Sequence, residues 1–374
     1  MIRLLHTADV HLGKQFPLLV NKATEYRSQL IDTFEKIVTL AVIEKVSILL
    51  IAGDLFDSKF IFGLTIGKVI AAFKKLEASG IRICIIPGSH DVYAEDSLYR
   101  FLTFPQNVTV FTPVCRQKEY ADLDLTVYGL VQDSNMSTEN TLKSLSLSKS
   151  SRYHIGLAHG NLKESGITEN NILVLGKDEI SASGLNYLAL GHQHEFQDIH
   201  TSRTIACYSG SPEPIEVDRK GSGRVVLISI KGENQVEIQP VYIASKRYES
   251  MTVDISPFSS ATTIEKMIAA RADLNLIMEV HLAGLQSLKY EMNCQKFENL
   301  LKARFFHLRV IDESHPNLDE IDFTNYPEKT VAGRYIRNMQ EKISSAQNIQ
   351  EKALYEESFR LGFNLLKGNL QVIE

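Results

Sequence analysis

Residues 4–11 read LLHTADVH, an apolar run that ends in two residues able to bind a metal ion, Asp9 and His11. These side chains stand two positions apart, and an extended backbone directs such a pair to the same face. Four other apolar runs end in acidic, hydroxyl or imidazole side chains: LLIAGDLFD (49–57), IIPGSHD (85–91), IGLAHG (155–160) and LALGHQHE (188–195). A strand followed by metal-binding residues is therefore the repeated pattern of this chain.

The first two-thirds of the chain alternate short apolar runs with amphipathic ones. Residues 24–45 and 63–79 have apolar side chains at helical spacing, and a strand-like run follows each segment. Strands that are apolar on both faces and alternate with helices indicate an α/β sheet covered on both sides. Beyond residue 120 the runs are β-rich, which predicts a second sheet packed against the first. Open α/β sheets place their sites at the carboxyl ends of their strands, where the five runs end.

The pattern divides the chain into three parts. Residues 1–245 contain all five runs, and residues 246–318 predict a small α+β domain of order β-α-β-α-β. Residues 319–374 are strongly helical, and their apolar stripe predicts either a face for a partner protein or one that packs back on the chain itself. The Ser/Thr-rich residues 134–151 are expected to form a loop with a short helix.

The composition is that of an ordinary globular protein. The 374 residues are 44% hydrophobic and carry a net charge of −5, which neither indicates nor excludes a polyanionic partner. The N-terminal residues lack the pattern of a signal peptide, and no apolar run reaches the ~20 residues that cross a bilayer. We therefore expect no membrane partner. The four cysteines are widely spaced without a C-x-x-C pair, which favours the reducing cytoplasm.

The five runs offer carboxylates and imidazoles but no thiolate. A single histidine at a strand end is usually a hydrogen-bonded residue, and we favour this interpretation for His154 and His200. Five such ends indicate metal binding instead, since glycines suited to tight turns flank them at positions 53, 88, 160 and 191. The mixed ligand set suits manganese, iron or zinc, and it exceeds what one ion needs. We therefore expect two divalent ions, which together activate a water and hold both ends of a displacement at phosphorus.

The motifs D-x-H, G-D, G-S-H-D, H and G-H-x-H, in this order over residues 9–194, resemble those of the calcineurin-like metallophosphoesterases. Within that superfamily, HTADVHLGK, IAGDLFDS and GHQHE are similar to the SbcD-type DNA-repair nucleases. The resemblance implies an α/β fold, a two-sheet α-β-β-α sandwich. It also implies that residues 246–314 form the small α+β capping domain that holds DNA in that family, before a helical C-terminus.

The resemblance also assigns roles to the predicted site residues. It implies that Asp9, His11 and His194 hold the first metal ion, that His159 and His192 hold the second, and that Asp54 bridges both. It implies that His90 binds no metal but approaches the scissile phosphate, where it donates a proton or stabilises the transition state.

Two residues at this site need separate interpretation. The family has an asparagine where this chain has Ser89, and the asparagine carbonyl is a ligand of the second metal. The shorter serine hydroxyl is a weaker ligand, so we expect the second ion to bind more weakly than the first. The resemblance implies that Asp57 bonds His90 and fixes its tautomer, whereas a plain turn aspartate is the alternative.

The function expected from the resemblance is a manganese-dependent DNA nuclease, an exonuclease or endonuclease that acts in DNA repair with an SMC-like, SbcC-type ATPase; a homodimer is left open. Lys14, Arg203, Arg219 and Lys220 are candidates for phosphate contacts, or else scattered surface charges. One alternative is a phosphatase or phosphodiesterase for nucleotides or another small substrate. The other is a non-catalytic scaffold that binds DNA ends or an ATPase, and only Ser89 favours it.

Overall fold

The computed structural model divides the chain into two compact units, Met1–Tyr248 and Glu249–Glu374. The structure describes residues 1–58, 60–131, 142, 145–163, 173–215, 222–233, 235–287, 290, 292–317, 320 and 323–366. Most of the Ser/Thr-rich segment lies outside the described residues, as do Arg219 and Lys220. The two units have separate cores, so each is described by itself.

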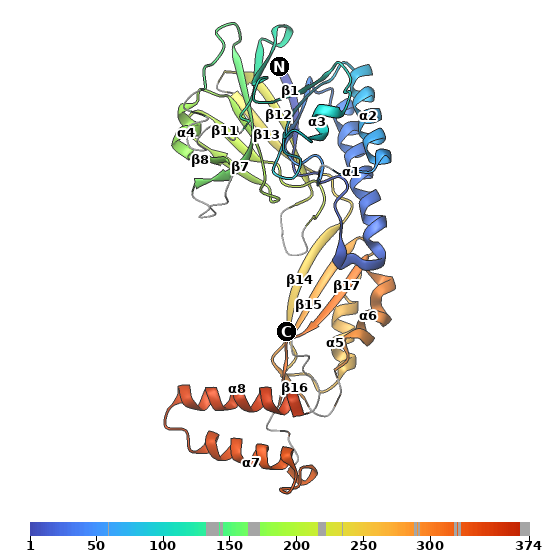
Figure 1. Ribbon diagram of the computed structural model, residues 1–374, viewed down its shortest axis with the longest axis vertical. Helices are drawn as coiled ribbons and strands as arrows, with labels where there is room; N and C mark the ends of the chain where they lie inside the picture. Colours follow the sequence, from blue (N-terminus) through green and yellow to red (C-terminus); the bar gives the residue numbers. More distant parts are fainter. Residues whose placement is uncertain are drawn as a thin grey trace. The chain divides into compact units, whose positions relative to one another are not determined.

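The first unit contains two sheets that lie face to face (Figure 1). The first has strand order β13-β12-β1-β2-β3-β4. Its strands are β1 (Ile2–Thr7), β2 (Ile48–Ala52), β3 (Arg82–Ile86), β4 (Val108–Val110), β12 (Arg224–Gly232) and β13 (Gln235–Tyr242). Strands β1 to β4 are parallel to one another, whereas β12 is antiparallel to both of its neighbours, β1 and β13. All residues of β2 are buried, as expected for a strand covered on both faces.

The second sheet has strand order β10-β11-β9-β7-β6-β5, and β8 pairs with β7. Its strands are β5 (Gln117–Tyr120), β6 (Leu125–Gly129), β7 (Tyr153–Leu162), β8 (Leu173–Leu175), β9 (Tyr187–Gly191), β10 (Gln197–His200) and β11 (Ile205–Tyr208). Strands β6, β7, β9 and β11 are parallel. One apolar core fills the space between the sheets, with residues such as Leu4, Leu50, Leu157 and Ala189.

Helices cover the outer faces of this sandwich. Figure 1 shows α1 (Ala23–Ile43) and α2 (Gly63–Ala78) on one side of the sheets and α4 (Lys177–Ala182) on the other. The first two helices pack together through Phe34 and Phe73, whose ring centroids are 6.1 Å apart. A short helix, α3 (Leu98–Phe101), precedes β4. The expected two-sheet α/β sandwich is thus confirmed, and both long helices lie within two residues of their predicted bounds.

The second unit contains an α+β part and a helical hairpin. Strands β14 (Arg247–Asp254), β15 (Leu276–Ala283) and β17 (His307–Asp312) form a three-stranded sheet. Helices α5 (Ala261–Ala269) and α6 (Cys294–Leu301) share its core. The short strands β16 (Leu285–Gln286) and β18 (His315–Pro316) pair with each other. Helices α7 (Val331–Ser344) and α8 (Ile349–Leu366) have a core of their own. The division at residues 245 and 318 stays a prediction.

Among the residues that the structure describes, no helix is both long and apolar enough to span a membrane.

His6 is a buried polar residue inside the sandwich. It lies in β1 between Leu4 and Ala8, on the face that contacts the second sheet, and its Nδ1 is 2.9 Å from the hydroxyl of Tyr187 in β9. Burial lowers the pKa of His6 from 6.5 to about 3. Between these pH values the unfolded chain binds a proton that the folded chain does not, so the free energy of unfolding must fall as the pH falls through this window.

We therefore predict that His6→Gln flattens the acid branch of the stability curve. Glutamine can still bond the Tyr187 hydroxyl but does not titrate. Between pH 6.5 and 5 the free energy of unfolding of the variant should fall by about 1–2 kcal/mol less than that of the parent chain. Urea unfolding at several pH values measures this difference. Parallel curves for the two proteins would show that His6 is not buried in its neutral form.

Candidate metal centre

The loops after β1 and β2 run side by side and bring their acidic and imidazole residues together. The backbone N–H of Asp9 donates to the carbonyl of Gly53 at 3.1 Å, and that of His11 donates to the carbonyl of Asp54 at 2.9 Å. Three of the five runs end at the carboxyl ends of strands in the first sheet. In the second sheet, His159 lies within β7, beside the end of β9, and His192 and His194 follow β9. The predicted site residues therefore come from both halves of the sandwich.

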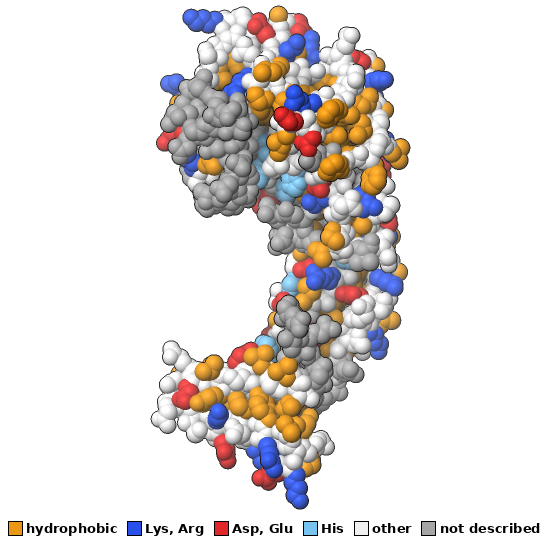
Figure 2. Space-filling model, viewed as in Figure 1, with side chains coloured by type: hydrophobic (Ala, Val, Ile, Leu, Met, Phe, Trp, Pro, Cys, Tyr) orange, Lys and Arg blue, Asp and Glu red, His pale blue; other side chains and the backbone are white. Residues whose placement is uncertain are grey.

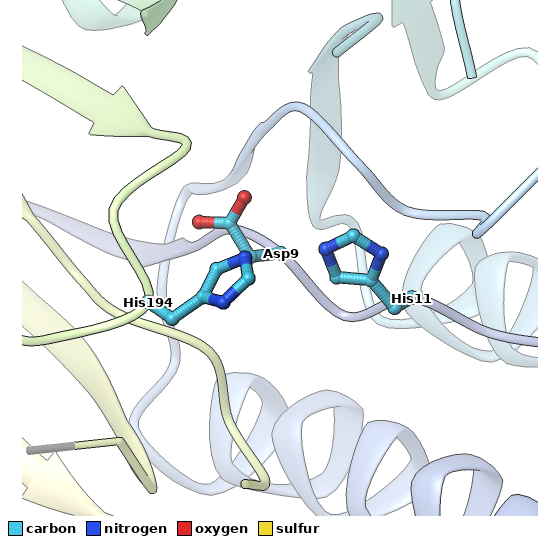
Figure 3. Close-up of side chains that lie close together, drawn as sticks. All are labelled: Asp9, His11 and His194. Carbon is cyan, nitrogen blue, oxygen red and sulfur yellow. The ribbon is translucent and has the colours of Figure 1, made fainter. Parts of the chain in front are cut away.

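One group of possible ligands consists of Asp9, His11 and His194, whose ligand atoms lie within 4.8 Å of one another. All three residues are buried. Figure 3 shows the carboxylate of Asp9 and the two imidazoles around a common space. The centroids of the rings of His11 and His194 are 5.3 Å apart. This is the set that the sequence predicts for the first ion.

A second group contains Asp9, Asp54 and His159. Nε2 of His159 lies 3.3 Å from Oδ2 of Asp54. The Ser89 hydroxyl donates to that same Oδ2 at 3.2 Å and lies 3.3 Å from Nε2 of His159. The Ser89 hydroxyl thus lies beside the second group. Asp9 belongs to both groups, and Oδ2 of Asp54 also lies 3.7 Å from Nε2 of His11 in the first group.

His192 lies beside the second group, although it does not belong to the groups within 4.8 Å. Its ring centroid is 5.3 Å from that of His159. Its backbone N–H donates to both carboxylate oxygens of Asp9, at 3.0 and 3.1 Å. Of the predicted aspartate and histidine ligands, His192 is the one that none of these groups contains.

Hydrogen bonds fix the tautomers of two of these histidines. Nδ1 of His159 is 3.0 Å from the carbonyl of Ala52, and Nδ1 of His11 is 2.9 Å from the carboxylate of Asp57. A carbonyl and a carboxylate only accept, so both Nδ1 atoms must carry hydrogen. Nε2 of each ring therefore points into the centre, as in histidines that bind metal ions and are held by a second hydrogen bond.

The bond predicted between Asp57 and His90 involves the backbone carbonyl of Asp57 rather than its side chain. The Asp57 carboxylate accepts from His11 at 2.9 Å and from Lys14 at 3.3 Å, whereas it lies 3.7 Å from Nδ1 of His90. Nδ1 of His90 instead donates to the backbone carbonyl of Asp57 at 3.2 Å. The loop after β2 reaches His90 with its backbone and His11 with its side chain, so Asp57 orients a predicted metal ligand.

His90 lies at the accessible side of the centre. Its side chain is 44% exposed, whereas that of His11 is fully buried. The backbone N–H of His90 donates to Oδ1 of Asp54 at 2.8 Å, which fixes the loop after β3 next to the carboxylate. The ring centroids of His90 and His11 are 4.6 Å apart. His90 is therefore adjacent to both groups while its Nε2 remains available to a substrate.

The backbone at this site is unusual at four residues with side chains. Asp9, His11, Asp54 and His192 have φ angles of 53°, 49°, 48° and 97°, in the left-handed region that costs a non-glycine residue of order 1–3 kcal/mol. Such strain persists only where surrounding bonds determine it, and it concentrates at functional sites. Two glycines are required by close approach: a Cβ at Gly53 would collide with the His159 ring, and one at Gly191 with the carbonyl of Ala52.

Acidic and imidazole groups of the cluster shift one another's pKa values. Burial alone would raise the pKa of Asp54, but His159 and His11 hold it well below its ordinary value. Burial would likewise lower the pKa of His159, but Asp54 and Asp9 raise it to about 10. Burial raises the pKa of Asp9 to about 7. Without metal, Asp54 and His159 thus form an ion pair, and a cation that binds there must displace the proton of His159.

The residues present fit a pair of divalent ions. Nε2 of His11 is buried and has no hydrogen-bond partner within the described part of the chain, although it lies 3.7 Å from Oδ2 of Asp54. A buried polar atom in this state costs free energy, and an ion between it and the carboxylate would remove the cost. Carboxylate, imidazole and hydroxyl donors suit manganese, iron or zinc.

Two features of the site escape the sequence pattern. The sequence pattern places Asp91 among the metal-binding strand ends. In the structure, Asp91 instead accepts hydrogen bonds from the backbone of Gly88 and Phe56 and from the hydroxyl of Tyr99, at 2.7, 3.1 and 2.6 Å. Asp91 therefore stabilises the loop that carries Ser89 and His90. The amide of Gln193, between the two histidines of the last run, bonds the side chain of Asn161. Neither contact can be predicted from periodicity or motif spacing.

Comparisons with known proteins agree with this geometry. The family described as calcineurin-like phosphoesterase matches residues 2–196, more than half of the chain. The SbcD component of the SbcCD nuclease of Bacillus subtilis is 25% identical over 86% of this chain and 89% of its own length. The DNA double-strand break repair protein Mre11 of Saccharolobus solfataricus is 28% identical over 57% of this chain and 55% of its own.

A further relative is the uncharacterized metallophosphoesterase YhaO of Bacillus subtilis, 24% identical over 71% of this chain and 66% of its own length. The matches to YhaO and to the Saccharolobus protein thus span less than two-thirds of those relatives. The match over residues 2–196 includes all the strand ends that form the centre. The chain belongs to the calcineurin-like phosphoesterases and is a metallophosphoesterase, a hydrolase.

Proposed function

We propose that the chain is a metal-dependent DNA nuclease that hydrolyses phosphodiester bonds in DNA repair, together with an SMC-like ATPase. The observation that carries the proposal is the alignment with the SbcD component of the SbcCD nuclease, which extends over 86% of this chain. A match of that length must include part of the second unit, which a relative sharing only the phosphoesterase sandwich would lack. Among the candidate phosphate contacts, Lys14 and Arg203 lie in the described part of the chain.

In this proposal Asp9, His11 and His194 would hold one ion, His159, His192 and Ser89 would hold the other, and the Asp54 carboxylate would serve both. When bound, the ions supply an activated water and polarise the phosphoryl oxygens. The protein residues position this chemistry: Asp57 and the Ala52 carbonyl orient the rings of His11 and His159. The backbone N–H of His90 holds Oδ1 of Asp54 and leaves Oδ2 to the cluster.

His90 is the proposed proton donor. Its Nδ1–H is bound to the Asp57 carbonyl, so Nε2 is the atom that faces substrate. A protonated imidazole there would stabilise the charge that develops on the phosphoryl group and then protonate the leaving oxygen. Its exposure agrees with this role, since a group that acts on the substrate must be reachable.

The second unit supplies the proposed contacts with macromolecules. The sheet of β14, β15 and β17 with its two helices would be the capping domain that holds duplex DNA by phosphate contacts. Helices α7 and α8 bury Ile336, Met339, Phe359 and Phe363 between them. Other apolar side chains of the hairpin remain exposed, among them Val331, Ile349, Leu354, Leu361 and Leu365. Figure 2 shows a band of hydrophobic side chains on the visible face of this part of the molecule. This band is the proposed face for the ATPase.

One experiment separates the candidate functions. The full chain is incubated with manganese and labelled linear DNA, and in parallel with a chromogenic phosphodiester and a chromogenic monoester. We expect cleavage of DNA and of the diester, and a chelator should abolish both. Efficient hydrolysis of the monoester without DNA cleavage would identify a phosphatase. Binding of DNA by the protein, without hydrolysis of any substrate, would identify a scaffold.

A first prediction separates proton donation from metal binding. His90→Asn should lower the rate of diester hydrolysis by about 10²–10⁴, the usual contribution of a positioned proton donor. Its manganese stoichiometry should stay that of the parent chain, because the His90 side chain belongs to neither group assigned to an ion, although it lies in a further group with His11 and Asp57. Activity assays and calorimetric titration with manganese measure the two effects. Loss of an ion from the variant would make His90 a ligand and contradict the assignment.

A second prediction concerns Ser89. A short, neutral hydroxyl should make the second ion bind more weakly than the first, so occupancy should rise in two steps as manganese is added. Activity should follow the weaker step, since both ions hold the displacement. Ser89→Asn should lower the manganese concentration needed, and Ser89→Ala should change it little if water fills the gap. Manganese titrations of the three proteins, with His159→Ala as reference, would refute this role if Ser89→Ala proved as damaging as that reference.

A third prediction concerns pH. The pKa of His159 is raised to about 10 and that of Asp9 to about 7 in the metal-free protein, so both groups hold protons that an ion must displace. Metal binding should therefore release protons and tighten as the pH rises from 6 to 8, by up to about tenfold per pH unit for each proton released. Calorimetry in buffers of different ionisation enthalpy measures the release. An affinity that is constant over this range would contradict the ion pair of Asp54 and His159.

A further inference from the structure

Glu213 is a fully buried acidic residue that the metal centre does not use. It lies in the loop after β11, and its carboxylate accepts three hydrogen bonds. The hydroxyl of Thr33 in α1 donates at 2.5 Å, the backbone N–H of Ser245 at 2.6 Å and that of Lys246 at 3.1 Å. One side chain thus joins three segments that are far apart in the sequence.

The loop that carries Glu213 also holds the backbone of His194. The N–H of Ser211 donates to the carbonyl of His194 at 3.0 Å, and the N–H of Gly223 donates to the carbonyl of Ser211 at 2.7 Å. The N–H groups of Ile243 and Ala244 in turn donate to the carbonyl of Gly223, at 2.8 and 3.2 Å. Two routes of hydrogen bonds therefore connect residues 243–246 with this loop, one through Gly223 and one through Glu213.

The chemistry of the Glu213 pocket requires an acceptor with two oxygens. Backbone N–H groups only donate, and they approach both oxygens of the carboxylate, Ser245 at Oε1 and Lys246 at Oε2. Burial raises the pKa of Glu213 on balance, although the nearby Lys36 acts to lower it. The ammonium group of Lys36 donates to the Ser245 hydroxyl. A glutamine of the same shape would point an N–H₂ group at one of these donors.

Residues 243–246 lead directly into β14, the strand that crosses from the first compact unit into the second. We propose that Glu213 is a positioning residue for the metal centre: it fixes the 243–246 segment to the loop that holds His194, so that the backbone at this ligand depends on the segment that leads into the second unit. The inference rests on His194 as a metal ligand and is independent of DNA as the substrate.

The test compares Glu213→Gln with a matched control, Glu237→Gln. Glu237 lies in β13, is exposed and pairs with Lys231, so the same change there leaves the 209–215 loop intact. Calorimetric titration with manganese chloride, well below the melting temperatures, should show affinity weakened by roughly 2- to 30-fold in Glu213→Gln and unchanged in the control. Amide hydrogen exchange should be faster at Ser245 and Lys246 in Glu213→Gln, and faster at Ser211, whose N–H donates to the carbonyl of His194.

A second variant keeps the test decisive if Glu213→Gln does not fold. Thr33→Val is nearly isosteric and removes the bond from α1 while it leaves both backbone donors in place. It should weaken manganese binding in the same direction but by less, and the chromogenic diester should show the same order of half-saturating manganese concentrations. If both variants lose thermal stability but bind manganese as the parent chain does, Glu213 is a structural residue and the proposal is wrong. That outcome would leave the proposed nuclease function untouched.

Discussion

The carboxylate of Asp54 is held by groups from both sheets of the sandwich at once. Its Oδ2 lies 3.3 Å from Nε2 of His159, which comes from the second sheet, and accepts from the Ser89 hydroxyl of the first sheet at 3.2 Å. Its Oδ1 accepts from the backbone of His90 at 2.8 Å. In a buried site such a charge must be compensated, because an isolated carboxylate would be expelled or neutralised. The remaining site residues are arranged around this constraint.

The need to compensate Asp54 from both sheets explains why the backbone is strained at the ends of these strands. The two sheets must approach closely enough for imidazoles of one to reach a carboxylate of the other, which leaves no room for a Cβ at Gly53 or Gly191. The loops after the strands must also turn within a few residues, and Asp9, His11 and Asp54 take left-handed φ angles to do so. Backbone bonds between the loops after β1 and β2 offset this cost. The fold therefore holds the predicted ligands in position before an ion binds, which favours affinity and rate.

Sequence reasoning predicts the strands, the covered sheets and the convergence of five strand ends, because these follow from local apolar patterns and from general rules of α/β topology. It does not predict which neighbouring groups form hydrogen bonds with the site residues. The choice of Asp57 between His11 and His90 depends on less than 1 Å, 2.9 against 3.7 Å, and this difference arises from the path of one loop. The burial of Glu213 under residues 243–246 also joins segments that no motif connects.

We infer that the strand ends form one centre for two ions that share Asp54. Anomalous diffraction from manganese-soaked crystals, recorded near the manganese absorption edge, can test this arrangement. We expect two peaks about 3.5–4 Å apart, one bound by Asp9, His11 and His194 and the other by His159, His192 and Ser89, with Asp54 in contact with both. A single peak at saturating manganese, or a second peak without contact to Asp54, would contradict it.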